Sequence, residues 1–125
     1  MIAVLFEVTP LPGQEARYFD IAAMLREHLQ AIDGFESVER FQSLTRPGTY
    51  LSLSYWRDEA AVRAWRNQAD HRTGQTEGRA AVFADYRIRV AQVLRDYTQT
   101  QRSEAPDDSN AALLTPSLSP HHPPA

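Results

Sequence analysis

The first third of the chain alternates between an apolar run and a helical pattern. Ile2 to Val8 is short, β-branched and apolar, which predicts a strand that ends in the proline-rich turn before Gly13. From Gln14 to Ile32 apolar residues recur at helical spacing, with charged residues between them. Asp33 and Gly34 follow, and a glycine in the left-handed conformation is a common helix end. This part therefore predicts a strand followed by a helix.

The middle of the chain predicts a β-hairpin. Residues 35–44 alternate loosely, Thr45 to Gly48 predicts a turn, and Thr49 to Arg57 (TYLSLSYWR) alternates cleanly. Leu51, Leu53 and Tyr55 fall on one face of this second strand, and Tyr50, Ser52, Ser54 and Trp56 fall on the other.

The last ordered elements are predicted to be helical and then extended. Asp58 and Glu59 open a helix with Ala61, Val62 and Trp65 on its apolar side, and a second short helical stretch is expected over 70–81. Tyr86, Ile88 and Val90 then alternate with arginines in a strand expected to continue to Tyr97. The order β-α-β-β-α-β predicts an α+β, ferredoxin-like fold with an antiparallel four-stranded sheet and both helices on one face.

The sheet face without helices needs a cover. We expect that face to carry Phe35 or Val38 together with Tyr50 and Trp56, which is a large apolar area to leave in water. A homodimer in which two sheets pack face to face would bury it.

Composition changes near Thr98. Residues 98–125 hold five of the eight prolines and no aromatic side chain, so we expect a disordered proline- and serine-rich tail after a folded domain over residues 1–97.

The net charge is −3, which gives no basic face for nucleic acid. There is no cysteine and no apolar run long enough to cross a bilayer, so a cytoplasmic protein with no membrane partner is expected.

The stretch FESVERFQSL…GTYLSLSYWRDEAAVRAWRNQADHRTGQ, followed by FADYRIRVAQVLRDY, resembles the antibiotic biosynthesis monooxygenase (ABM) family of dimeric α/β barrels. The resemblance covers about residues 1–97. It is carried by the strand that ends in an aromatic residue, by the pattern from Trp56 to Trp65, and by a histidine after the second helix is expected to break.

The resemblance implies one of several activities. The heme-degrading branch has an asparagine in the first strand and a histidine ten residues after the tryptophan, where this chain has Phe6 and Gln75, so heme is disfavoured. The quinone-forming branch pairs the tryptophan with a proton-carrying residue six positions later, which here is His71. That branch also has an amide one turn before the tryptophan, where this chain has Ala61.

Cofactor-free oxygenation needs a base, an apolar pocket and donors near the developing oxyanion. His71 has the pKa range for the base, and Trp65 offers an aromatic wall and an N–H donor, although a tryptophan on an apolar helix stripe also fits a core role. Arg40 and Arg79 are candidates to hold a substrate anion. The remaining candidate substrate-binding residues, for which sheet packing is the competing interpretation, are Phe6, Tyr50, Trp56 and Phe83.

The sequence thus predicts a monooxygenase that uses no cofactor and no metal, with a small electron-rich aromatic such as a quinol, phenol or anthrone and molecular oxygen as its partners. The competing hypothesis is a non-catalytic, small-ligand-binding or stress-associated protein on the same scaffold, and the amide missing at Ala61 favours it.

Overall fold

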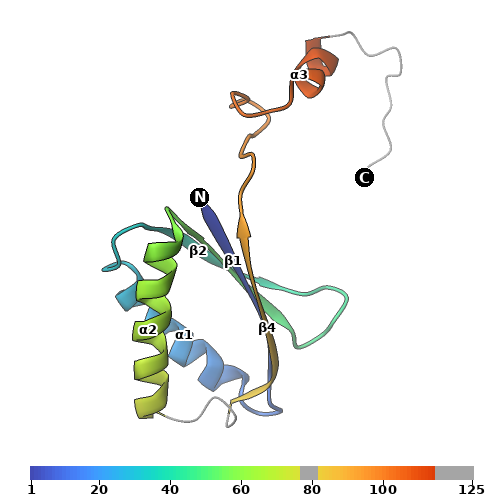
Figure 1. Cartoon of the computed structure of the whole chain (residues 1–125). Helices are drawn as coiled ribbons and strands as arrows, with labels where there is room; N and C mark the ends of the chain where they lie inside the picture. The colour runs from blue at the N-terminus through green and yellow to red at the C-terminus, as the bar shows by residue number, and fades with distance from the viewer. Residues whose placement is uncertain (77–81, 115–125) are drawn as a thin grey trace. The chain divides into compact units, whose positions relative to one another are not determined.

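The chain divides into two compact units, Met1–Gln92 and Val93–Ala125, in a computed structural model that describes residues 1–76 and 82–114. For residues 69–76 and 114 it describes the backbone alone. The first unit contains the sheet and two helices, and the second contains a further helix (Figure 1).

The first unit has the predicted β-α-β-β-α-β order. Its elements are β1 (Ile2–Pro10), α1 (Glu15–Leu29), β2 (Phe35–Gln42), β3 (Tyr50–Trp56), α2 (Glu59–Thr76) and β4 (Phe83–Gln92). The strands form one antiparallel sheet in the order β2-β3-β1-β4, and both helices lie on one face of it (Figure 1). The ferredoxin-like α+β fold is confirmed.

Helix α2 differs from its prediction because it is continuous. It begins after Asp58, whose Oδ1 accepts a hydrogen bond from the Ala61 N–H at 2.9 Å, and this bond lowers the pKa of the Asp58 carboxyl. It then runs unbroken through Gly74 to Thr76. The prediction of a break before a second helix at 70–81 is therefore wrong as far as Thr76, and residues 77–81 lie outside the described residues. A glycine inside a helix weakens it without ending it.

The two faces of the β2–β3 hairpin are the reverse of the prediction. Trp56 is 1% exposed and packs in a buried cluster with Ile2, Leu29 and Ala61 on the helix side. Tyr50 also faces the helices, where it contacts Tyr18 of α1. The face without helices carries Leu51, Leu53 and Tyr55 of β3 instead, because successive strand residues point to opposite sides.

The second unit departs from the expectation for the tail. Strand β4 ends at Gln92 rather than at Tyr97, and helix α3 (Asp107–Leu114) forms within the segment expected to lack structure. The Arg102 guanidinium lies 5.1 Å from the Tyr97 ring centre, and its Nε donates to Asn110 Oδ1 at 2.8 Å. No helix in the described ranges is long and apolar enough to cross a membrane.

Gly34 is the most closely packed of the three glycines Gly13, Gly34 and Gly48. Its φ is +93°, and a Cβ added there would lie 2.9 Å from the Ala61 Cβ. Gly13 has a φ of +80° but nothing within 4 Å of such a Cβ. Both glycines relieve backbone strain, and Gly34 in addition lets α2 approach the start of β2.

We expect Gly34→Ala to lower the free energy of unfolding by about 1 kcal/mol more than Gly13→Ala, since both substitutions strain the backbone and only the first meets a neighbour. Urea denaturation of the two variants measures the difference. Equal losses would show that the contact with Ala61 relaxes without cost.

Candidate functional site

The helix-facing surface of the sheet brings together most of the predicted site residues. Residues opposite one another in the antiparallel pairs lie on the same face, so the register defines rows that cross all four strands. One row consists of Arg40, Ser52, Phe6 and Ile88. The row on one side of it is Val38, Ser54, Val4 and Val90, and the row on the other side is Gln42, Tyr50, Val8 and Tyr86.

Two apolar clusters lie between this surface and the helices. The first is centred on Trp56, and Trp65 and Val38 pack against it. The second contains Val8, Tyr18 and Val82, with Phe6, Ile21, Tyr50 and Phe83 packed against it. The predicted residues Phe6, Tyr50 and Phe83 therefore share one cluster, whereas Trp56 and Trp65 share the other.

The two tryptophans have different surroundings. Their rings are stacked with centroids 6.5 Å apart. Trp56 is almost fully buried, and its Nε1 donates to Ser54 Oγ at 2.9 Å. Trp65 is half-buried, and its indole N–H makes no hydrogen bond to any residue that the structure describes. Trp56 therefore has no surface or donor to offer a ligand, and Trp65 has both.

Helix continuity changes the relation between Trp65 and His71. Both lie on α2, six residues apart, so their backbone positions differ by about 120° around the helix axis and about 9 Å along it. The side chain of His71 and the whole of Arg79 lie outside the described residues. The catalytic role of His71 and the anion-binding role of Arg79 therefore stay predictions.

Aromatic rings surround Phe6. Its ring centroid lies 5.9 Å from that of Phe83 in an edge-to-face contact and 5.9 Å from that of Tyr86. Tyr50 stacks on Tyr18 with centroids 6.1 Å apart, and its hydroxyl donates to Glu15 Oε2 at 3.0 Å, which raises the pKa of Tyr50. The second cluster is thus largely aromatic, and the Tyr50 hydroxyl is hydrogen-bonded to Glu15 of helix α1.

Arg40 carries the one charge in the three rows. Its guanidinium carbon lies 6.0 Å from the centre of the Tyr18 ring. Its Nε is shielded from solvent, and no hydrogen-bond partner reaches it within the described parts of the chain. Burial raises the pKa of the Tyr18 hydroxyl, with Arg40 opposing this, so Tyr18 remains neutral and does not neutralise the guanidinium.

Sequence reasoning missed Tyr18, Ser52 and Ile88 as members of this surface. Tyr18 lies among the apolar positions at helical spacing between Gln14 and Ile32, and the other two lie on predicted strands. Their proximity follows from the β1–β3 and β1–β4 registers, which pair Phe6 with Ser52 and with Ile88. The alternation of apolar and polar residues within one strand does not show how that strand pairs with its neighbours.

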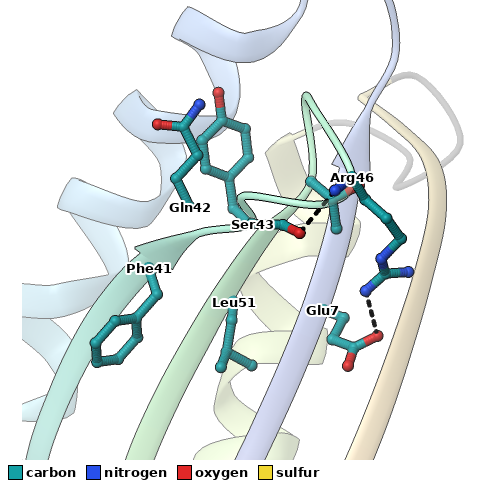
Figure 2. A pocket seen from close by; sticks show the side chains of 8 residues that line it. Glu7, Phe41, Gln42, Ser43, Arg46 and Leu51 are labelled. Atoms are coloured by element: carbon teal, nitrogen blue, oxygen red, sulfur yellow. Dashed lines mark hydrogen bonds and ion pairs between the residues drawn. The ribbon is translucent and has the colours of Figure 1, made fainter. Parts of the chain in front are cut away.

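A hollow lies at the turn end of the hairpin, on the face opposite to the helices (Figure 2). It has a volume of about 250 Å³. Glu7 accepts from Arg46 Nη2 at 3.2 Å and from Arg89 Nη1 at 3.1 Å, and the Arg46 hydrogen bond is the main reason that the pKa of Glu7 is lowered. Both Glu7 oxygens are therefore paired, and the two guanidiniums exceed the single carboxylate by one positive charge. The lining residues of the hollow are Glu7, Phe41, Gln42, Ser43, Arg46, Thr49, Tyr50 and Leu51.

No group of three histidine or acidic side chains in the described residues could hold a metal ion. The helix-facing surface offers aromatic walls, an indole donor and one cation, which suit a small organic ligand.

The chain is similar to known proteins in sequence and in fold. The family model for antibiotic biosynthesis monooxygenase matches residues 1–77. A relative from Pyricularia oryzae, named jasmonate monooxygenase ABM, is 50% identical over 93 residues, which cover 74% of this chain and 43% of the relative. The chain spans about half the length of the curated relatives it matches.

Solved structures show the same fold at low identity. The PA3566 protein of Pseudomonas aeruginosa superposes with a TM-score of 0.63 at 19% identity, covering 74% of this chain and 93% of that one. The NE2512 protein of Nitrosomonas europaea, described as of unknown function, gives 0.64 at 21%, covering 78% and 92%. The chain belongs to the antibiotic biosynthesis monooxygenase family.

The different surroundings of the two tryptophans predict different costs of substitution. Trp56→Phe should lower the free energy of unfolding by about 1–3 kcal/mol, because it leaves a cavity and an unpaired Ser54 hydroxyl in the core. Trp65→Phe should cost less than about 1 kcal/mol. Urea denaturation followed by far-ultraviolet circular dichroism measures both, and a larger loss for Trp65→Phe would place Trp65 in the core.

Proposed function

We propose that this chain is a monooxygenase that oxidises a small, electron-rich organic molecule held against the helix-facing surface of the sheet. The observation that carries the proposal is the family match over residues 1–77, supported by the 50% identical relative whose name includes monooxygenase. The aromatic cluster around Phe6 and the available indole N–H of Trp65 fit a flat, largely apolar substrate.

The proposed reaction uses the substrate as its own reductant. His71 removes a proton from a phenol or anthrone, and the resulting anion passes electrons to oxygen and forms a carbon-bound peroxide. The O–O bond then breaks as a carbonyl forms. One oxygen atom remains in the quinone and the other leaves as water with the two hydrogens lost by the substrate. The Trp65 N–H stabilises the developing oxyanion.

The name of the Pyricularia oryzae relative adds a second substrate class. Jasmonate is a carboxylic acid with an apolar body, not a phenol. We therefore propose that this chain accepts small acids as well as quinols, and both belong in a substrate panel.

A non-catalytic binding role is the competing proposal. Ala61 occupies the position where the quinone-forming branch has an amide, and it is 4% exposed and closely packed against Gly34. An amide there would have little room. The same surface without that amide could bind a ligand without oxidising it.

Oxygen uptake separates the two proposals. Wild-type protein should consume oxygen with at least one member of a panel of hydroquinones, anthrone and jasmonic acid, and His71→Ala should slow that reaction about 100-fold or more, the usual contribution of a general base. His28→Ala, a half-buried histidine on α1, is the control and should leave the rate unchanged. Unchanged turnover in His71→Ala would refute the base, and no uptake by the wild type would favour the binding protein.

We also propose that two copies pair through the sheet face that lacks helices. That face has an apolar centre of Leu5, Leu51, Leu53 and Tyr55, and Phe41 is 42% exposed at its edge. Glu39, Arg87 and Arg89 lie in the same rows and surround the centre with charge of both signs. An apolar centre with a charged rim is the usual composition of a self-complementary interface.

Leu53→Asp should convert the dimer to a monomer, because it places a carboxylate in the apolar centre. The matched control is Leu44→Asp in the hairpin turn, where the leucine is 97% exposed. Light scattering should give about twice the chain mass of 14.2 kDa for wild type and for Leu44→Asp, and a single chain mass for Leu53→Asp. A monomeric wild type at micromolar concentration would refute the interface.

A further inference from the structure

The buried Nε of Arg40 needs an explanation. Buried polar groups are paired in almost all proteins, and leaving one unpaired is unfavourable. Within the described chain, the recorded contacts of Arg40 are with Tyr18: its guanidinium carbon lies 6.0 Å from the Tyr18 ring centre, and a side-chain hydrogen bond from Arg40 opposes the rise in the Tyr18 pKa. Neither contact gives the buried Nε a partner. An arginine in this state is suited to an anion that arrives from outside the chain.

The residues in line with Arg40 change from polar to apolar across the sheet. Ser52 stands next to it on β3, then Phe6 on β1, then Ile88 on β4. Neighbouring strands are about 4.8 Å apart, so the row spans about 14 Å. Ile88, at the far end, is 52% exposed although it lies on the helix-facing side. The row is thus a cation and a hydroxyl followed by an aromatic and an aliphatic side chain.

We propose that the row Arg40–Ser52–Phe6–Ile88 binds an amphipathic carboxylic acid across the strands. The Arg40 guanidinium pairs with the carboxylate, and the apolar body of the acid lies along Phe6 toward Ile88. This makes Arg40 the residue that selects acids over neutral ligands. As a substrate assignment it rests on the proposed oxygenation, but as a binding site it stands alone.

Two further observations support an anion at Arg40. The protein has a net charge of −3, so an anion is repelled on average and needs a local cation. Tyr18, the neighbour of Arg40, is kept neutral by burial, so the arginine charge remains available. A guanidinium also binds a carboxylate with two parallel hydrogen bonds, which gives orientation as well as attraction.

The test compares an acid with its own methyl ester, because the two differ in charge and hardly in shape. Jasmonic acid with methyl jasmonate and decanoic acid with methyl decanoate are titrated into the full chain by calorimetry. Wild type should bind at least one acid about tenfold or more tightly than its ester, the usual magnitude of a hydrogen bond to a charged group. Equal affinities, or no binding by either acid, would overturn the proposal.

Substitutions in the row Arg40–Ser52–Phe6–Ile88 test whether these residues cause the preference for the acid. Arg40→Gln should remove the preference for the acid and leave ester binding within about twofold, and Arg40→Lys should retain part of it. Arg63→Gln, at an exposed position of α2, removes the same charge and should change nothing. Ile88→Ser should weaken acid and ester together, since both have the apolar body. An equal loss of acid and ester in Arg40→Gln would show a packing role and overturn the proposal.

Measurements of stability and of oxygen uptake distinguish failure of the acid site from failure of the proposed oxygenation. Arg40→Gln should unfold at the same urea concentration as wild type or a higher one, because it removes an unpaired buried group. If that variant does not fold, Arg40→Lys carries the test through its ratio of acid to ester affinity, and an unchanged ratio refutes the role. Acid-selective binding without oxygen uptake on any substrate would refute the proposed oxygenation alone. Oxygen uptake on neutral quinols without acid selectivity would refute the acid site alone.

Discussion

The close approach of Gly34 to Ala61 determines how the second helix lies on the sheet. Four element ends meet there, because the Arg57 N–H donates to the Gly34 carbonyl at 2.8 Å and the Arg57 guanidinium pairs with both Asp33 oxygens at 3.1 Å. Asp58 then caps α2 through the Ala61 N–H. A surface ion pair is a weak contact by itself. The packing of Gly34 against Ala61 and the cap at Asp58 orient the start of α2. Trp65, one turn after Ala61, reaches the core for that reason.

The register of the sheet determines what Trp65 and its neighbours face. Because β1 is central, its residues set the rows, and each row continues onto β3 and β4. Trp56 and Tyr50 contribute to different clusters, and Arg40 lies in a row between theirs. Phe6, in the same row as Arg40, packs in the cluster that includes Tyr50.

Element order and the hairpin were predictable because they depend on short-range patterns. Alternation over Thr49–Arg57 and the turn before it define the hairpin without knowledge of any neighbour. Which face is buried was not predictable in the same way, since β3 has large side chains on both faces: Tyr50 and Trp56 on one, Leu51, Leu53 and Tyr55 on the other. The burial of Trp56 depends on its packing with Ile2, with Leu29 of α1 and with Ala61 of α2, which the alternation within β3 does not contain.

The site was predictable only in part, for a related reason. Phe6, Tyr50 and Phe83 were candidate substrate-binding residues and share a cluster, although Tyr50 was expected on the other face of the sheet. Trp65 was expected to point inward and packs on the core. The pairing of Trp65 with His71 was implied by the family resemblance, and a helix break was expected between them; the helix instead continues through Gly74. One glycine weakens a helix without ending it, so Gly74 does not by itself mark a helix end.

The exposure of Ile88 has a consequence for how this scaffold can diversify. Because Ile88 lies on the outer strand and is half open to solvent, its replacement disturbs few neighbours. A larger side chain there would shorten the space beyond Phe6, and a smaller one would extend it, with the polar end at Arg40 unchanged. Chain length of a bound molecule could therefore be altered by mutation at one position, independently of head-group recognition and at little cost in folding.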